Sequence, residues 1–314
     1  MSRTDLAIPR IVCVLGPTGV GKTAIAMKLS ERWGAEIVSA DSMQIYRQMN
    51  IGTSKPTLEE QNRIPHHVID VVDPDQPFDV SRYRELADEA IRELHRVKKR
   101  VFVVGGTGLY IRALLGGLIE GPGADEDFRG GLREEVNKKG RAHLYEILQE
   151  KDPSAAKVIH PHDVLRIIRA LEVLELTGRS IVDHHQRHRF RSVSWNALRI
   201  GLRMGRGDLN ERINRRTDRM MAAGFLDEVR RLLADGYGES LKPMQALGYR
   251  HLTSVVRGGR KLEEAVELIK RDTRLYAKRQ MTWFAADDSI NWFSPDDIKG
   301  VSAVVERFFA GEDY

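Results

Sequence analysis

Hydrophobic positions in the first third of the chain form short runs separated by segments of helical spacing. Four runs rich in β-branched residues have strand length, at 11–15, 36–39, 68–72 and 101–104. Two intervening segments, 24–29 and 81–97, repeat apolar residues every three or four positions, as amphipathic helices do. This alternation predicts an α/β fold with a parallel sheet covered by helices on both faces. Ligands of such sheets bind at the carboxyl ends of the strands, so the loops beginning at Gly16, Asp41 and Gly105 are expected to converge.

The pattern changes after Gly121, where a Gly-Pro-Gly sequence interrupts the chain. Helical spacing then dominates, at 126–139, 142–150, 153–159 and 162–177. Apolar alternation returns at 195–204, which predicts a strand, and Asp208 with Glu211 has the spacing of a helix capping box. Further helices are expected at 225–235 and 262–285, and a last strand at 290–293. We therefore expect an α/β core made of 1–120 and 195–314, with a helical insertion domain at 121–194.

Composition and charge narrow the class of protein. The 314 residues carry a net charge of +5, which suits a polyanionic partner but is also common among soluble enzymes. The single cysteine, Cys13, excludes an internal disulfide and a cysteine-based zinc site, and favours a reducing compartment. The sequence has neither a signal-peptide pattern nor an apolar run long enough to span a membrane. We expect a cytoplasmic protein, and a monomer because no exposed apolar stripe is evident.

The first apolar run is followed by a glycine-rich motif, G-x-x-x-x-G-K-T. In such loops backbone N–H groups and a helix N-terminus surround a polyphosphate, so the motif predicts a P-loop NTPase-like sheet. Lys22 is expected to reach the terminal phosphates, and the Thr23 hydroxyl to ligate Mg²⁺. The motif consists of Gly16, Pro17, Thr18, Gly19, Val20, Gly21, Lys22 and Thr23.

Two loops beside the motif carry candidate reactive groups. Asp41 opens the loop after the second run, where it could be a turn or capping residue, a Mg²⁺ ligand through water, or a general base. Thr107 lies in a Gly-Gly-Thr-Gly sequence after the fourth run, where many kinases have a Mg²⁺-binding aspartate instead. Glycines permit close approach of a substrate, although Thr107 could equally cap the following helix.

Arginines recur at helical spacing in the later segments. The stripes are Arg166 with Arg169, Arg212 with Arg216 and Arg219, and Arg271 with Arg274 and Lys278. A basic stretch containing one phenylalanine, 187–191, has a composition suited to an RNA backbone. Each of these could also be an ordinary solvated surface. The ten histidines lack the carboxylates or cysteines that would complete a metal site.

Taken together, the motifs closely resemble those of the tRNA dimethylallyltransferases. The resemblance begins at the glycine-rich loop, continues in S-A-D-S-M-Q-I-Y-R at 39–47 and I-G-T-S-K-P at 51–56, and includes G-G-T-G-L-Y at 105–110. It extends through H-P-H-D at 160–163, R-A-L-E-V at 169–173, G-Y-R at 248–250 and A-K-R-Q-M-T-W at 277–283. It covers nearly the whole chain in the family's order. One departure is Leu165, where bacterial members often have a glutamine.

The resemblance implies transfer of a dimethylallyl group from dimethylallyl diphosphate to N6 of adenosine 37 in the anticodon loop of tRNA, with Mg²⁺. The glycine loop and Arg216 would bind the diphosphate, Asp41 would accept the proton of the attacking amine, and Thr107 would support the substrate. Contacts to tRNA would come from Asp41, Ser42, Met43, Gln44, Thr107, Arg129, Leu165, Arg166, Ile167, Ile168, Arg169, Gly248, Tyr249, Arg250, Lys278 and Arg279.

Three other functions fit parts of the sequence. A small-molecule P-loop kinase explains the glycine loop and the sheet, but not the Gly-Gly-Thr-Gly loop. An adenylate isopentenyltransferase shares the chemistry, but it would not need a basic insertion. A non-catalytic RNA-binding protein would leave Asp41 beside a phosphate loop unexplained.

Overall fold

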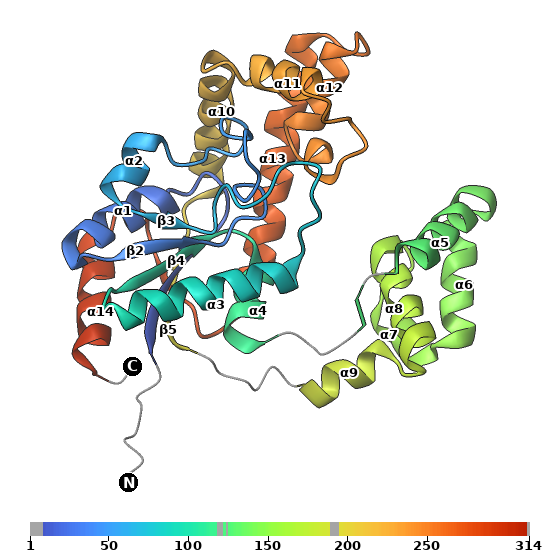
Figure 1. Ribbon diagram of the computed structural model, residues 1–314, viewed down its shortest axis with the longest axis horizontal. Helices are drawn as coiled ribbons and strands as arrows, with labels where there is room; N and C mark the ends of the chain where they lie inside the picture. The colour runs from blue at the N-terminus through green and yellow to red at the C-terminus, as the bar shows by residue number, and fades with distance from the viewer. Residues whose placement is uncertain (1–8, 118–121, 124, 189–194, 313–314) are drawn as a thin grey trace. The chain divides into compact units, whose positions relative to one another are not determined.

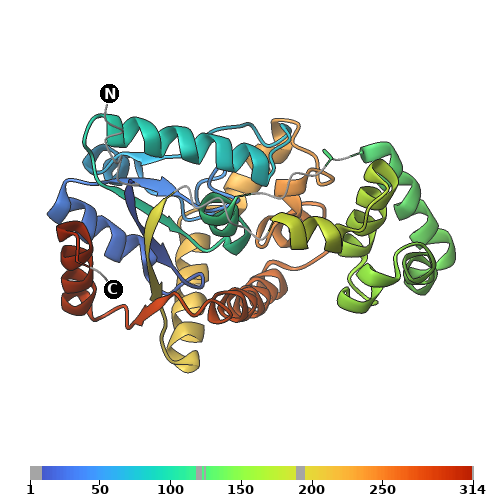
Figure 2. The ribbon, with the colours of Figure 1, turned by 90° about the horizontal axis from the view of Figure 1, so that it is seen from below.

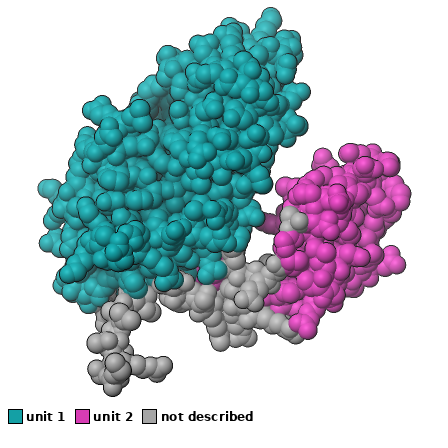
Figure 3. Space-filling model, viewed as in Figure 1, with its two compact units in different colours: residues 1–115, 194–314 teal, residues 116–193 magenta. Residues whose placement is uncertain are grey.

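The computed structural model describes 9–117, 122, 123, 125–188 and 195–312, and the side chains of 185–188 are not described. The chain divides into two compact units, shown in different colours in Figure 3. The first comprises 1–115 and 194–314, and the second comprises 116–193, against the range 121–194 expected from the sequence.

The first unit is built on a six-stranded parallel sheet, in the order β3-β2-β4-β1-β5-β6 (Figure 1). The strands are β1 (Arg10–Leu15), β2 (Glu36–Ser39), β3 (His66–His67), β4 (Val101–Gly105), β5 (Asn196–Leu202) and β6 (Asn291–Phe293). β1 lies between β4 and β5, so the glycine loop emerges near the middle of the carboxyl edge. The expected parallel α/β fold is confirmed.

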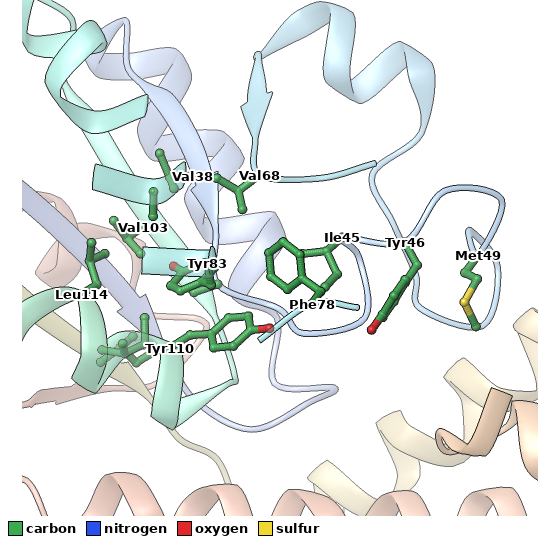
Figure 4. Packing of buried hydrophobic residues seen from close by; sticks show 14 of the residues in the cluster. Val38, Ile45, Tyr46, Met49, Val68, Phe78, Tyr83, Val103, Tyr110 and Leu114 are labelled. Atoms are coloured by element: carbon green, nitrogen blue, oxygen red, sulfur yellow. The ribbon is translucent and has the colours of Figure 1, made fainter. Parts of the chain in front are cut away.

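Helices cover both faces of this sheet because alternate strand residues point to opposite faces. Cys13 and Val103 pack with Tyr83 of α3 (Val80–Arg96) in one buried cluster. Figure 4 shows Tyr83 stacked with Tyr110 of α4 (Gly108–Gly116) in this cluster. Val14 and neighbouring strand residues pack with α1 (Lys22–Trp33) and α14 (Ile298–Ala310) in the other. Figure 2 shows α3 and α14 on opposite sides of the sheet.

The prediction of a strand at 68–72 is wrong. The third strand is the short β3, and Val68 and Asp70 have positive φ angles of 60° and 50°, which break an extended chain. The N–H groups of Asp70 and Val71 instead donate to the carbonyls of Gln44 and Ile45, so the segment lies along the loop after β2. Val68 is buried there and Val71 and Val72 are partly buried, without joining the sheet.

The remaining helices of this unit support the carboxyl edge. They are α2 (Leu58–Arg63), α10 (Arg206–Ala222), α11 (Phe225–Ala234), α12 (Tyr249–Val256) and α13 (Leu262–Ala285), with a 3₁₀ turn at Lys242–Gln245. The capping box expected at Asp208 is wrong, because α10 begins at Arg206 with Gly205 as its N-cap. Asp208 lies in the first turn, where its charge still complements the helix dipole.

The second unit is entirely helical in its described part. It contains α5 (Glu126–Lys139), α6 (Arg141–Lys151), α7 (Pro153–Val158), α8 (Val164–Thr177) and α9 (Ile181–His188). Leu144, Leu148, Ile167 and Leu171 are buried at the centre of its own hydrophobic cluster. Aspartates 125, 152 and 163 accept hydrogen bonds from backbone N–H groups at the starts of α5, α7 and α8. Among all described residues, none of the helices combines the length and hydrophobicity that crossing a membrane requires.

Candidate active site

The glycine loop joins β1 to α1 and has the form of an anion-binding site. Gly16, Gly19 and Gly21 have positive φ angles of 141°, 83° and 106°. A Cβ atom on Gly16 would also lie 2.7 Å from the carbonyl oxygen of Leu202, so this position requires glycine. Because α1 begins at Lys22, its first N–H groups have no partner one turn earlier in the helix. The loop thus offers backbone donors and the positive end of a helix to an anion.

Two half-buried cations, Lys22 and Arg216, bond to residues of this loop. Lys22 Nζ donates to the carbonyls of Gly16 and Pro17 at 2.9 and 2.8 Å. Arg216 of α10 donates to the hydroxyls of Thr18 and Ser54 at 2.5 and 2.9 Å. Burial lowers the pKa of Lys22 to about 8; Asp41 opposes that shift and Arg216 adds to it. Burial also lowers the pKa of Arg216. A bound polyanion would favour the charged forms of both side chains.

The loop after β2 presents Asp41 beside Thr107. Asp41 Oδ1 accepts the N–H groups of Met43 and Gln44 at 2.8 and 3.4 Å, which fixes the side chain in a local turn. Thr107 Oγ1 accepts the N–H of Ser42 at 3.1 Å. The N–H of Thr107 donates to the carbonyl of Ala40 at 3.2 Å. The two loops therefore hold each other directly at the carboxyl edge of the sheet.

Two cavities open on this edge and share a wall. The larger has a volume of about 900 Å³ and includes Lys22, Thr23 and Gln44. The smaller has a volume of about 490 Å³ and includes Ser42 and Met43. Six residues line both: Thr18, Asp41, Thr53, Arg216, Met220 and Tyr276. The larger cavity thus contains Lys22 and Thr23 of the glycine loop, and Asp41 stands where it meets the second.

The larger cavity has oxygen donors that suit a hard divalent cation. Thr23 and Asp41 line it, and Mg²⁺ binds hydroxyl and carboxylate oxygens while keeping several waters. No cluster of three His, Cys, Asp or Glu side chains occurs among the described residues, so an all-protein cage is absent there. These donors fit a metal bound mainly through its ligand's phosphates.

Most of the residues expected to contact RNA in the first unit line the smaller cavity, whereas Gln44 lines only the larger one and Thr107 and Lys278 line neither. Gly248, Tyr249, Arg250 and Arg279 line the smaller cavity, and Lys278 is exposed on α13. Tyr249 is 1% exposed and its hydroxyl donates to Glu228, so it supports the wall. Arg250 forms an ion pair with Asp272 at 2.8 Å.

Some arginines of the predicted stripes line cavities, and another bonds to a neighbouring helix. Arg216 lines both cavities and Arg219 the larger one. Arg212 lies by a third cavity of about 270 Å³ next to Gly21. Arg274 donates to Asn214 of α10 at 2.6 Å, so it joins two helices. The basic stretch at 187–191 falls on residues whose side chains the structure does not describe.

In the second unit, two expected RNA-contacting arginines hold a buried carboxylate. Glu172 is fully buried and accepts hydrogen bonds from Arg129 at 2.7 and 2.9 Å and from Arg169. Burial opposes ionisation of Glu172, but these hydrogen bonds together lower its pKa. Leu165 and Arg166 are exposed at the start of α8. Ile167 and Ile168 are buried, so only their backbones could reach a ligand.

Two residues that support the site were not predicted from the sequence. Glu228 of α11 is buried and accepts the N–H groups of Asn50, Ile51 and Gly52 at 2.7–3.1 Å, which anchors the loop that carries Ser54. Gln280 of α13 bonds both the glycine loop and the loop containing Thr107. Gln280 lies in the quoted motif at 277–283, which offered a signal, whereas the sequence around Glu228 offered none.

The chain is similar to known proteins over nearly its whole length. A family model described as IPP transferase matches residues 44–287, and one described as isopentenyl transferase matches 9–70. The chain is 53% identical to tRNA dimethylallyltransferase 2 of Syntrophus aciditrophicus, with 97% of this chain and 98% of that protein covered. It is 50% identical to the tRNA dimethylallyltransferase of Syntrophobacter fumaroxidans, with coverages of 97% and 89%.

Solved structures are similar over the same length. The tRNA isopentenylpyrophosphate transferase of Bacillus halodurans matches with a TM-score of 0.71 and 40% identity, with 97% of this chain and 96% of that chain covered. A eukaryotic dimethylallyltransferase described as acting on tRNA matches with a TM-score of 0.81 and 25% identity, with coverages of 97% and 80%.

Proposed function

The chain belongs to the IPP transferase family and transfers a dimethylallyl group to tRNA, and we propose that the donor is dimethylallyl diphosphate and the acceptor N6 of adenosine 37 in the anticodon loop. The observation that supports this assignment is the pair of adjoining cavities with Asp41 and Arg216 in their common wall. The larger cavity suits the diphosphate, and the smaller one suits the adenine. The reacting carbon would then meet the amine beside Asp41.

On the donor side, the protein stabilises a leaving group. As the C–O bond of the allylic donor breaks, negative charge grows on the diphosphate. Lys22, Arg216 and the N–H groups of the glycine loop are positioned to interact with that charge. This role explains why two half-buried cations lie at one loop although no carboxylate of the described residues is bonded to either.

On the acceptor side, Asp41 receives the proton that N6 loses on attack. An exocyclic amine is a weak nucleophile until that proton is removed, and a positioned carboxylate contributes by general-base catalysis. Hydrogen bonds from Met43 and Gln44 keep one oxygen of Asp41 oriented, and Thr107 supports the same loop next to the reacting centre.

The family requires a divalent metal, and we propose that it is Mg²⁺. When bound, it supplies positive charge to the diphosphate oxygens. Thr23 would be its ligand from the protein, with Asp41 in reach through water.

The substrate base must leave its stack to enter the smaller cavity, at a cost of a few kcal/mol. We propose that phosphate contacts offset this cost, from Lys278 and Arg279 in the first unit and from Arg166 in the helical insertion. The protein would act in the cytoplasm as a monomer.

Incubation with labelled dimethylallyl diphosphate, Mg²⁺ and unmodified tRNA tests the function. We expect label in RNA, located at adenosine 37 by nuclease digestion and mass spectrometry, and no label with a tRNA whose position 37 is guanosine. Label at another nucleotide would overturn the assigned acceptor. Transfer of phosphate from ATP without prenylation would show a kinase instead.

A further inference from the structure

Gln280 joins two loops of the active site through one side-chain amide. Its Oε1 accepts the N–H of Thr18 in the glycine loop at 2.8 Å, and its Nε2 donates to the carbonyl of Gly106 at 2.8 Å. The side chain is 7% exposed and lines the larger cavity. An otherwise buried polar group is therefore satisfied at both of its ends.

Helix α13 packs closely against the loop that contains Thr107. A Cβ atom on Gly106 would lie 2.3 Å from Gln280 Nε2, and one on Gly108 would lie 2.1 Å from the indole nitrogen of Trp283. Gln280 and Trp283 are three residues apart and share a face of the helix. Two adjacent contacts thus seat α13 on the loop that contains Thr107, and both depend on glycine.

The hydrogen bonds continue from this loop to the proposed base. Gly106 precedes Thr107, whose hydroxyl accepts the N–H of Ser42, the residue after Asp41. Gln280 therefore completes a connection from the diphosphate-binding loop to the loop of the base. The connection needs both an acceptor and a donor at residue 280. Glutamate would place a carboxylate against the Gly106 carbonyl, and methionine would supply neither bond.

We propose that Gln280 is a positioning residue that fixes the diphosphate-binding loop relative to Thr107 and Asp41. The inference rests on the proposed function, in which the leaving group and the proton acceptor must keep a set separation. Misplacement of about 1 Å can reduce a rate by about a hundredfold, so a link of this kind affects turnover more than RNA binding.

The test compares Gln280→Met and Gln280→Glu with Gln76→Met, a change at an exposed glutamine outside both cavities. We expect both changes at Gln280 to lower kcat about 10- to 100-fold while the Kd for tRNA stays within about twofold of wild type. The control should match wild type. A kcat within about twofold of wild type for Gln280→Met would overturn the proposal.

A double-mutant cycle with Thr107→Ala separates positioning from a general loss of stability. If Gln280 acts through the Thr107 loop, the combined loss in kcat is smaller than the product of the single losses by at least about threefold. If the kcat loss of the double variant equals the product of the two single losses, Gln280 does not act through the Thr107 loop.

Binding of inorganic pyrophosphate with Mg²⁺, measured by calorimetry, gives a readout that needs no turnover. We expect Gln280→Met to weaken it about fivefold, a loss of about 1 kcal/mol, while the melting temperature stays near wild type. Unchanged pyrophosphate affinity would overturn the proposal. If wild type failed to prenylate tRNA, the proposed function would fail, but this comparison would still report on Gln280.

Discussion

At the scale of single residues, the proposed chemistry depends on Asp41. Its carboxylate lines both cavities, and the backbone N–H groups of Met43 and Gln44 orient it. Removing a positioned general base usually costs about 10²- to 10⁴-fold in rate. We therefore expect Asp41→Asn to lower kcat by this amount while the Kd for tRNA changes little, as measured by single-turnover transfer and filter binding.

The matched control is Asp75→Asn, a change at an exposed aspartate that lines neither cavity. It should have wild-type kcat and Kd. Turnover of Asp41→Asn near that of the control would show that another group accepts the proton.

Lys22 leads to a prediction about pH. Its pKa is lowered to about 8, mainly by burial, so in the free enzyme it loses its charge as the pH rises through about 8. A neutral lysine attracts the diphosphate less, and kcat/KM reports groups of the free enzyme. We expect kcat/KM for the donor to fall above pH 8, with kcat less affected because the bound diphosphate keeps Lys22 charged.

Lys22→Arg separates this ionisation from others in the same range. Arginine remains charged throughout, so the variant should be less active but should lose the decline above pH 8. The same decline in Lys22→Arg as in wild type would assign it to a different group.

At the scale of elements, the buried carboxylate of Glu172 organises the helical insertion. It is held by Arg129 of α5, by Arg169 of α8 and by the N–H of Asp125. Breaking a buried ion pair typically costs about 3–5 kcal/mol. We expect Glu172→Gln to raise amide hydrogen exchange in 125–177 with little change in the first unit, as measured by mass spectrometry. A uniform change over both units would contradict this expectation.

The control for Glu172 is Glu134→Gln on α5, where an exposed glutamate pairs with Lys138. Such a pair contributes little, so exchange should match wild type. The pH dependence also has a definite sign. Because the pKa of Glu172 is lowered in the folded protein, its stabilisation is present above the ordinary glutamate pKa and is lost as the pH falls through the lowered value.

The sequence predicted elements well where hydrophobic periodicity alone determines them. The five longer strands and the insertion helices α5 to α8 fall close to the expected ranges. The run at 68–72 was misread because its valines bury themselves against the loop after β2 through left-handed turns, which periodicity does not encode. Asp208 was misread as a cap because Gly205, which carries no side-chain signal, occupies that position.

The candidate site was predictable in its motif residues and less so in its supports. Glycine spacing predicted the phosphate loop, and the loop positions of Asp41 and Thr107 made them candidates to which the family resemblance added roles. Glu228 and Gln280 act on residues more than 170 positions away in the chain. Such contacts arise only when the fold brings the segments together, so their partners cannot be predicted from local sequence, although Gln280 itself lies in the motif at 277–283.

At the scale of the whole molecule, cations that could meet RNA occur on both units. Arg166 is exposed at the start of α8 in the second unit, and Lys278 is exposed on α13 in the first. A net charge of +5 adds a long-range attraction for a polyanion. Binding of tRNA through many phosphates should therefore respond to salt far more than binding of the small donor.

We predict that log K for tRNA falls linearly with log salt, with a slope of about 0.7–0.9 for each phosphate neutralised. Arg166→Ala and Lys278→Ala should each weaken binding and reduce that slope by about one, because each removes one phosphate contact. Arg82→Ala is the control, since Arg82 is exposed on α3, pairs with Glu85 and lines neither cavity. Filter binding between about 50 and 200 mM salt measures all four proteins. A flat wild-type response would exclude the basic surfaces as the RNA site, and an unchanged slope in one variant would exclude that residue.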